Sequence, residues 1–162
     1  MNKKILYLDM DGVVADFEKR IGELEPSLIN FKDHPDQEVL SNKIDQICYA
    51  NPDIFHDLPP IEGAIEAVGK LAEQYEIFFL STAMWSLPQS FTGKRIWIED
   101  HFGNLGRKRL ILSHRKDLLK GDFLVDDRTK NGASEFEGEH IHFGTSKFPD
   151  WDSVYAYLCS KV

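Results

Sequence analysis

The sequence is short of cysteine, of long hydrophobic runs and of positive charge. Its 162 residues include two cysteines, Cys48 and Cys159, which form neither a metal-binding spacing nor a disulfide framework. So little cysteine fits a reducing, cytoplasmic location. No apolar run approaches the roughly 20 residues that span a bilayer, so no membrane partner is expected. Asp9 interrupts the apolar stretch that follows the basic start MNKK, so this stretch is too short for a signal peptide.

The charge balance argues against one class of partner. Lysine and arginine total 19 against 27 aspartates and glutamates, which gives a formal net charge of -8. Proteins that bind the backbone of DNA or RNA usually carry a basic surplus, so polymeric nucleic acid is not expected here. A small phosphate ester remains compatible with an acidic protein because a divalent cation can stand between two anions.

The rest of the composition is that of a globular domain. Hydrophobic residues make up 42% of the chain and charged residues 28%. A chain of this length can bury a core as one unit, so we treat residues 1–162 as a single domain. The sequence does not fix the oligomeric state, and a homodimer is compatible with it.

Short apolar runs alternate with segments of helical periodicity. Helices are expected over residues 61–75, 93–102 and 151–161, where apolar residues recur at helical spacing. Strands are expected at Lys4–Met10, Glu76–Ser81, Arg109–Ser113, Asp122–Asp126 and His140–Phe143. The alternation predicts an α/β fold with a doubly wound, Rossmann-like sheet of five parallel strands, covered on both faces. Such sheets bind ligands at the carboxyl ends of their strands.

Residues 17–60 break this alternation. The segment is too long for one crossover helix and contains the helical piece VLSNKIDQICYA. We expect a small helical cap inserted after the first strand, placed to cover the carboxyl edge of the sheet as a lid.

Carboxylates, hydroxyls and a lysine follow the predicted strands at this edge. The members are Asp9 and Asp11 after the first strand, Ser81 and Thr82 at the second, Lys116 after the third, and Asp126 and Asp127 at the fourth. Carboxylates so close together repel by several kcal/mol unless a cation neutralises them. Oxygen ligands without a supporting cysteine or histidine cluster suit Mg2+, with Asp9, Asp11, Asp126 and Asp127 as candidate ligands.

This set of residues can also perform phosphoryl transfer. One carboxylate can attack phosphorus to form an aspartyl-phosphate, while a second protonates the leaving oxygen and then activates water. Lys116 and the metal would neutralise the phosphoryl oxygens. Ser81 and main-chain amides near Gly12 and Thr82 would bind the phosphate, and glycine permits the close turn. His140 and His142 lack a third nitrogen or sulfur partner, which disfavours a metal site there.

The order DMDG, ST, K, DD resembles the haloacid dehalogenase superfamily of phosphohydrolases, from YLDMDGVVADFE to FLVDDRTKNG. The resemblance implies that Asp9 is the nucleophile and that Asp11 is the general acid/base, with its main-chain carbonyl also on Mg2+. It implies that Lys116 steadies the nucleophile and the phosphate. Asp127 would contact the metal directly, and Asp126 would act through water or Lys116. The phosphate-binding segment would be Ser81, Thr82 and Ala83.

Three stretches are similar to the 5'(3')-deoxyribonucleotidase group, which removes phosphate from deoxynucleoside monophosphates: DMDGVVADFE, NPDIFHDLPPIEGAIEAV and FLVDDRTKNG. That similarity implies that Phe17 and Phe55 flank the nucleobase, since aromatic rings stack on any base. The better-known members follow the second-motif hydroxyl with Ser-Pro and a nearby lysine, whereas this chain has STAMW. Preference for pyrimidine, deoxyribose or the 5' ester therefore does not follow.

Two other functions stay open from the sequence. One is a related phosphatase of sugar phosphates or other small metabolites. The other is a receiver-like signalling module, which also combines an aspartate, Mg2+, a hydroxyl and a lysine. The order of the residues disfavours the receiver, because its phosphoacceptor lies on the third strand and its lysine follows the fifth.

Overall fold

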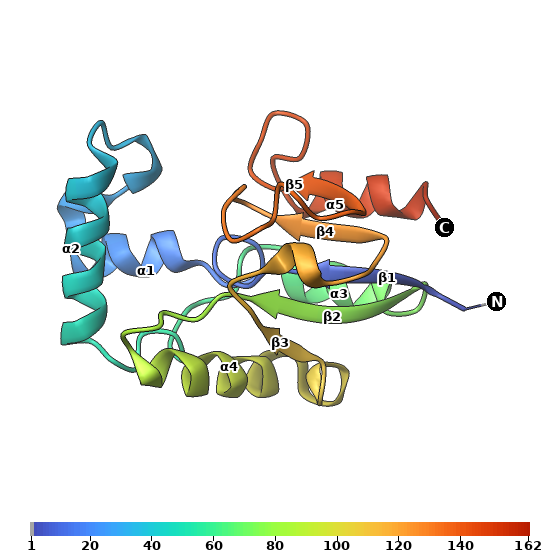
Figure 1. The fold of residues 1–162 in the computed structure, drawn as a ribbon, viewed down its shortest axis with the longest axis horizontal. Helices are drawn as coiled ribbons and strands as arrows, with labels where there is room; N and C mark the ends of the chain where they lie inside the picture. Colours follow the sequence, from blue (N-terminus) through green and yellow to red (C-terminus); the bar gives the residue numbers. More distant parts are fainter. Residues whose placement is uncertain (1) are drawn as a thin grey trace.

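The computed structural model describes residues 2–162, which are organised around one parallel sheet. Its strands are β1 (Lys4–Leu8), β2 (Tyr75–Ser81), β3 (Leu110–Leu112), β4 (Phe123–Asp126) and β5 (Glu139–His142). They lie in the order β3-β2-β1-β4-β5, with every neighbouring pair parallel (Figure 1). The expected five-stranded parallel sheet is confirmed. The strand order reverses beside β1, so the carboxyl ends of β1 and its neighbours form the crevice where such folds bind ligands.

The two faces of the sheet are covered in different ways. Leu6 and Leu8 point into a large core that includes residues of α3 (Ala64–Leu71), α4 (Pro88–Gly106) and α5 (Trp151–Cys159). Tyr7, between them, points into a smaller cluster with Ala133 and Phe136, as alternation along a strand requires. The second face is covered by η3 (Lys116–Leu118) and the turns before β5, so the helices gather on the first face.

Several predicted elements differ in their bounds, among them the helix expected over residues 61–75, which is the shorter α3. The first strand ends at Leu8 because the N–H groups of Val13, Val14 and Ala15 all donate to the carbonyl of Met10 and turn the chain. The fourth helix begins earlier than expected, with Pro88 at its first positions, where a missing N–H is tolerated. These shifts matter for the site, because Asp9 and Asp11 lie in the turn after β1 and not within a strand.

A helical insert, residues 17–60, stands beyond the carboxyl ends of the strands (Figure 1). It contains α1 (Phe17–Leu24), the short turns η1 (Pro26–Leu28) and η2 (Phe31–Asp33), and α2 (Gln37–Ala50). Two buried indoles hold the chain where the insert leaves and rejoins the core. Trp151 donates to the carbonyl of Val13 and Trp97 to that of Leu58, both at 2.7 Å. Within residues 2–162 we find no helix long and apolar enough to cross a membrane.

Candidate active site

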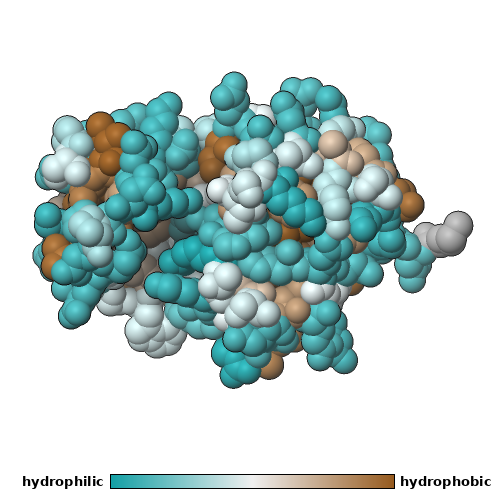
Figure 2. Space-filling model, turned by 90° about the horizontal axis from the view of Figure 1, so that it is seen from above, coloured by the Kyte–Doolittle hydropathy of each residue, from teal (hydrophilic) through white to brown (hydrophobic). Residues whose placement is uncertain are grey.

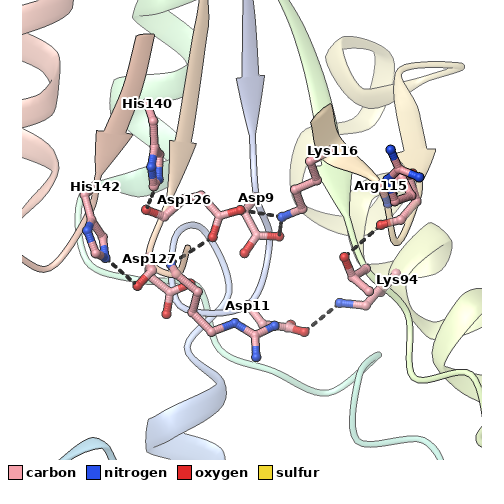
Figure 3. A network of polar contacts seen from close by, with 12 residues as sticks. Asp9, Asp11, Lys94, Arg115, Lys116, Asp126, Asp127, His140 and His142 are labelled. Atoms are coloured by element: carbon pink, nitrogen blue, oxygen red, sulfur yellow. Dashed lines mark hydrogen bonds and ion pairs between the residues drawn. The ribbon is translucent and has the colours of Figure 1, made fainter. Parts of the chain in front are cut away.

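Three carboxylates meet where β1 and β4 end (Figure 3). The register pairs Leu8 with Val125, so that Asp9 and Asp126 follow side by side. One oxygen from each of Asp9, Asp126 and Asp127 lies within 4.8 Å of the others. Asp9 and Asp126 are only 4% and 1% exposed, so water screens their charges weakly. Three of the four aspartates predicted for the site therefore form one acidic cluster, Asp9, Asp126 and Asp127.

Lys116 is the buried counter-charge of this cluster. Its Nζ donates to Asp9 Oδ1 at 3.0 Å and to Asp126 Oδ2 at 2.5 Å. Burial alone would lower the pKa of Lys116, but the charges of Asp9 and Asp126 raise it, which keeps the ammonium protonated. The lysine thus fixes one oxygen of Asp9 and leaves the other oxygen available for chemistry.

One lysine does not neutralise the acidic cluster. Burial, and then the charge of Asp9, raise the pKa of Asp126 to about 7 although Lys116 opposes the shift. Burial and Asp9 also raise the pKa of Asp127, against the charge of Lys32. The raised pKa values of Asp126 and Asp127 mean that keeping these carboxylates ionised side by side costs free energy. A divalent cation bound between them would lower that cost.

The donor set fits a hard divalent cation such as Mg2+. The acidic cluster offers only oxygen atoms, and Oδ1 of Asp127 is buried without a hydrogen-bond partner within residues 2–162. Such an acceptor costs free energy until a cation or donor meets it. Both oxygens of Asp126 already accept hydrogen bonds, from Lys116 and from the N–H of Arg128 at 2.9 Å. Asp9 and Asp127 are therefore the better direct ligands.

The carboxylate of Asp11 points away from the acidic cluster, contrary to the expectation that all four carboxylates share one small volume. The turn after β1 breaks the two-residue alternation, and Oδ2 of Asp11 instead accepts a hydrogen bond from Lys94 Nζ at 2.6 Å. Its Oδ1 is buried without a partner among the described residues. Any metal ligand from Asp11 would be its main-chain carbonyl, as the resemblance to the phosphohydrolases implies.

Lys94 is a site residue that the sequence analysis missed. It lies in α4, is 0% exposed, and its Nζ stands 5.0 Å from the centre of the Phe55 ring. Gly93 permits this approach, since a Cβ there would lie 3.1 Å from the main-chain nitrogen of His56. The sequence held a clue, because Lys94 precedes the buried Trp97 and Ile98 by three and four residues and so shares their apolar helix face.

A cavity of about 520 Å³ separates the strand ends from the insert, and the molecule is visibly hollowed between these two parts (Figure 2). A ligand of nucleotide size fits such a volume. The strand-end side is lined by Asp11, Gly12, Thr82, Ala83, Met84, Asp127, Arg128 and Lys130. The other side is lined by Phe17, Glu18, Phe31, Lys32, Gln37, Leu40, Ser41, Ile44, Asp45, Cys48 and Phe55.

The predicted phosphate-binding segment lies at the end of β2. Ser81 is 1% exposed, and Thr82 and Ala83 line the cavity. The hydroxyl of Thr82 donates to the carbonyl of Ser113 at 2.8 Å, so this side chain already has a structural partner. The main chain of Thr82 is therefore the part of this residue that remains available to a ligand in the cavity.

Phe17 and Phe55 both line the cavity but stack on each other. Their ring centres are 5.6 Å apart and their planes differ by 6°. A base inserted between them would require about 7 Å, which is two van der Waals contacts. In this arrangement a base can stack beside the pair but not between the two rings.

His140 and His142 support the acidic cluster through the main chain. Their Nε2 atoms lie 3.2 Å from the carbonyl oxygen of Asp126 and 3.0 Å from that of Asp127 (Figure 3). Burial lowers the pKa of His140, which favours the neutral ring. The two imidazoles thus contact the main-chain carbonyl groups of Asp126 and Asp127 and hold this part of the chain in place.

The sequence matches known proteins over nearly its whole length. The family model of the 5' nucleotidase, deoxy (pyrimidine), cytosolic type C protein matches residues 3–154. A protein of Vibrio phage KVP40, provisionally named a 5'(3')-deoxyribonucleotidase, is 44% identical over 99% of this chain and 87% of its own length. The cytosolic 5'(3')-deoxyribonucleotidase of Homo sapiens is 30% identical over 85% of this chain and 78% of its own length.

Solved structures with little sequence identity share the fold. A haloacid dehalogenase-like hydrolase of Xanthomonas campestris has a TM-score of 0.61 at 12% identity, covering 98% of this chain and 91% of that protein. A HAD-type hydrolase of Bacillus subtilis, solved with magnesium bound, has a TM-score of 0.58 at 10% identity, covering 98% and 99% of the two chains. The chain therefore has a haloacid dehalogenase-like fold, belongs to the family of the cytosolic type C 5'(3')-deoxyribonucleotidases and is a nucleotide phosphomonoesterase.

Proposed function

We propose that this phosphomonoesterase acts on deoxynucleoside monophosphates, with Asp9 as the nucleophile and Mg2+ held at the acidic cluster. The observation that carries this proposal is the state of Asp9, which is buried with one oxygen on Lys116 and the other free of protein donors within the described residues. The carboxylate is thereby oriented while one oxygen can approach phosphorus.

The reaction follows in two displacements. Asp9 forms a bond to phosphorus as the ester P–O bond breaks, and Asp11 gives a proton to the departing alkoxide. Asp11 then removes a proton from water, the hydroxide attacks phosphorus, and the bond to Asp9 breaks to release inorganic phosphate. Lys94 holds Oδ2 of Asp11, so Oδ1 is the oxygen that can carry this proton.

The phosphoryl oxygens are stabilised from several directions. Lys116 lies beside Asp9, while Gly12, Thr82 and Ala83 line the cavity and would supply the phosphate-binding groups together with the buried Ser81. When bound, Mg2+ would be held by Asp9, Asp127 and the carbonyl of Asp11, and would neutralise charge on the phosphoryl oxygens. Gly12 allows the close turn, since its φ is 80° and a Cβ would lie 2.2 Å from Asp127 Oδ2.

The insert would act as a cap that carries the contacts to the nucleoside. The cavity between the insert and the strand ends contains the edge of the Phe17–Phe55 pair, on which a base can stack. The polar face of α2 contributes Gln37, Ser41 and Asp45 to the same cavity. These groups suit a nucleoside better than a small sugar, because they combine an aromatic surface with hydrogen-bonding partners.

Phosphate release tests the proposal directly. We expect Mg2+-dependent hydrolysis of dUMP and dTMP, lost with EDTA, and much slower release from glucose 6-phosphate. Comparable rates on sugar phosphates would contradict the nucleotide assignment. Asp9→Asn barely changes side-chain volume and should abolish turnover with the fold intact, whereas retained turnover would refute the covalent route.

A cytoplasmic location completes the proposal, and a homodimer, which the sequence allows, is the assembly to be tested. The location is supported by two free cysteines and by the cytosolic type of the matching family. Cell fractionation tests the first, and light scattering of the purified protein tests the second.

A further inference from the structure

Lys32 connects the helical insert to the acidic cluster. It lies in η2, and its Nζ is 3.1 Å from Asp127 Oδ2 and 3.9 Å from Glu18 Oε2. All three residues line the cavity at the strand ends. Neither displacement of the proposed hydrolysis makes use of this lysine.

The two partners of the Lys32–Asp127 pair have unequal surroundings. The side chain of Lys32 is 50% exposed, whereas that of Asp127 is 6% exposed. A half-exposed ammonium on a flexible stem gains little net free energy from such a pair. Lys32 can therefore leave Asp127 without disturbing the core.

The excess negative charge of the acidic cluster is what attracts Lys32. Asp9, Asp126 and Asp127 share a small volume, with Lys116 as their buried counter-charge. A divalent cation bound there would remove much of the attraction that Asp127 exerts on Lys32. The ammonium would then stand at the wall of a cavity that receives a phosphate dianion, and its three donors suit phosphoryl oxygens.

We propose that Lys32 is a substrate-binding residue that exchanges partners. It pairs with Asp127 when the acidic cluster holds no metal, and with a phosphoryl oxygen of the substrate when metal and substrate are bound. The inference rests on the proposed function in taking the ligand to be a phosphate monoester.

Binding measurements on Lys32→Gln test this exchange. Calorimetry gives the affinity for Mg2+ alone and then for inorganic phosphate at saturating Mg2+. We expect Mg2+ to bind about twofold to fivefold more tightly, because a competing ammonium is gone. We expect phosphate to bind about tenfold more weakly, because a charged hydrogen bond is lost.

Two variants serve as controls. Lys43→Gln makes the same charge change on the exposed side of α2, outside the cavity lining, and should shift neither affinity. Lys32→Arg keeps the charge and should retain phosphate affinity within about threefold.

The inference requires that Lys32→Gln bind Mg2+ more tightly and inorganic phosphate more weakly than the unmodified protein. Unchanged Mg2+ affinity in Lys32→Gln would show that the lysine does not compete with metal, and unchanged phosphate affinity would show that it does not contact the anion. A fall in both affinities would make Lys32 a structural residue of the insert. Each of these results overturns the inference. None of them involves turnover, so they are independent of the dUMP assay that tests the proposed function.

Discussion

The ammonium of Lys94 lies 2.6 Å from Oδ2 of Asp11, and Lys94 itself is 0% exposed. The pair joins α4 to the turn after β1, across 83 residues of sequence. A buried lysine needs such a partner, because an unpaired charge there would be costly. The direction in which Asp11 points is therefore set by the packing of a distant helix.

Replacing Lys94 with methionine should slow the chemical step. The change keeps the length of the side chain but frees Asp11, so we expect kcat to fall about tenfold to a hundredfold with little change in KM. Breaking a buried pair typically costs 3–5 kcal/mol, and we expect about 2–3 kcal/mol because 25% of the Asp11 side chain is exposed. Steady-state kinetics and urea unfolding measure both effects.

Lys70→Met is the matched control for that change. It removes a Lys–Glu pair of the same 2.6 Å length, to Glu66, in which the side chains are 53% and 74% exposed. Exposed pairs contribute less than about 1 kcal/mol, so neither kcat nor stability should move appreciably. If Lys94→Met and Lys70→Met behave alike, Lys94 does not position the catalytic acid.

The sequence predicts the framework of this site better than its details. FLVDD is an apolar run that ends in two aspartates, so a buried strand with Asp126 and Asp127 at its end could be predicted from the sequence. The orientation of Asp11 could not be predicted, because it depends on the turn at Met10 and on the contact with Lys94 of α4. The mutual stacking of Phe17 and Phe55 likewise depends on how the insert packs against the core.

Gly12→Ala should inactivate the enzyme. A Cβ at this position would lie 2.2 Å from Oδ2 of Asp127, and its φ of 80° is strained for alanine. We expect metal affinity to fall at least about tenfold, because Asp127 must move.

Gly69→Ala is the control, since a Cβ there has nothing within 4 Å and the residue lies inside α3. That change should stabilise the protein by about 0.5–1 kcal/mol with kcat unchanged. Full metal affinity in Gly12→Ala would show that the turn tolerates a side chain.

Asp127→Asn should change stability in opposite directions with and without Mg2+. Removing one of three buried like charges should raise the metal-free Tm by about 2–4 °C. Metal binding to the native protein stabilises it by about 2.7 kcal/mol when Mg2+ is a hundredfold above its Kd, and this gain should be lost in the variant. Thermal unfolding with EDTA or Mg2+ measures both terms. Asp53→Asn removes an exposed carboxylate outside the acidic cluster and should leave both values unchanged. A Mg2+-induced rise that survives in Asp127→Asn would place the metal elsewhere.

Phe17→Ala should weaken binding of nucleotides specifically. Phe17 is partly exposed and lines the cavity, and stacking of a base on an aromatic ring contributes about 1–3 kcal/mol. We expect KM for dUMP to rise about tenfold. KM for deoxyribose 5-phosphate should stay within about twofold of its value in the unmodified enzyme, because that ester has no base. Phe55→Ala is the contrasting variant, since Phe55 is 6% exposed and its loss should cost about 3–5 kcal/mol of stability. An equal rise in KM for both esters would make Phe17 a packing residue only.

The thiol of Cys48 should resist modification over the ordinary pH range. Burial and then the charge of Asp11 raise its pKa to about 12, and the thiolate is the reactive form. Because the pKa is raised, the unreactive thiol persists to higher pH, and at pH 8 only about one molecule in ten thousand carries the thiolate. In a Cys159→Ser variant, labelling by a disulfide reagent should be slow from pH 7 to 9 and rapid after denaturation. Cys48 lines the cavity from α2, so its reactivity also measures how far the insert opens. Labelling at the rate of a free thiol at pH 8 would mean that the insert spends much of its time away from the core, and substrate closure rather than preformed packing would then complete the site.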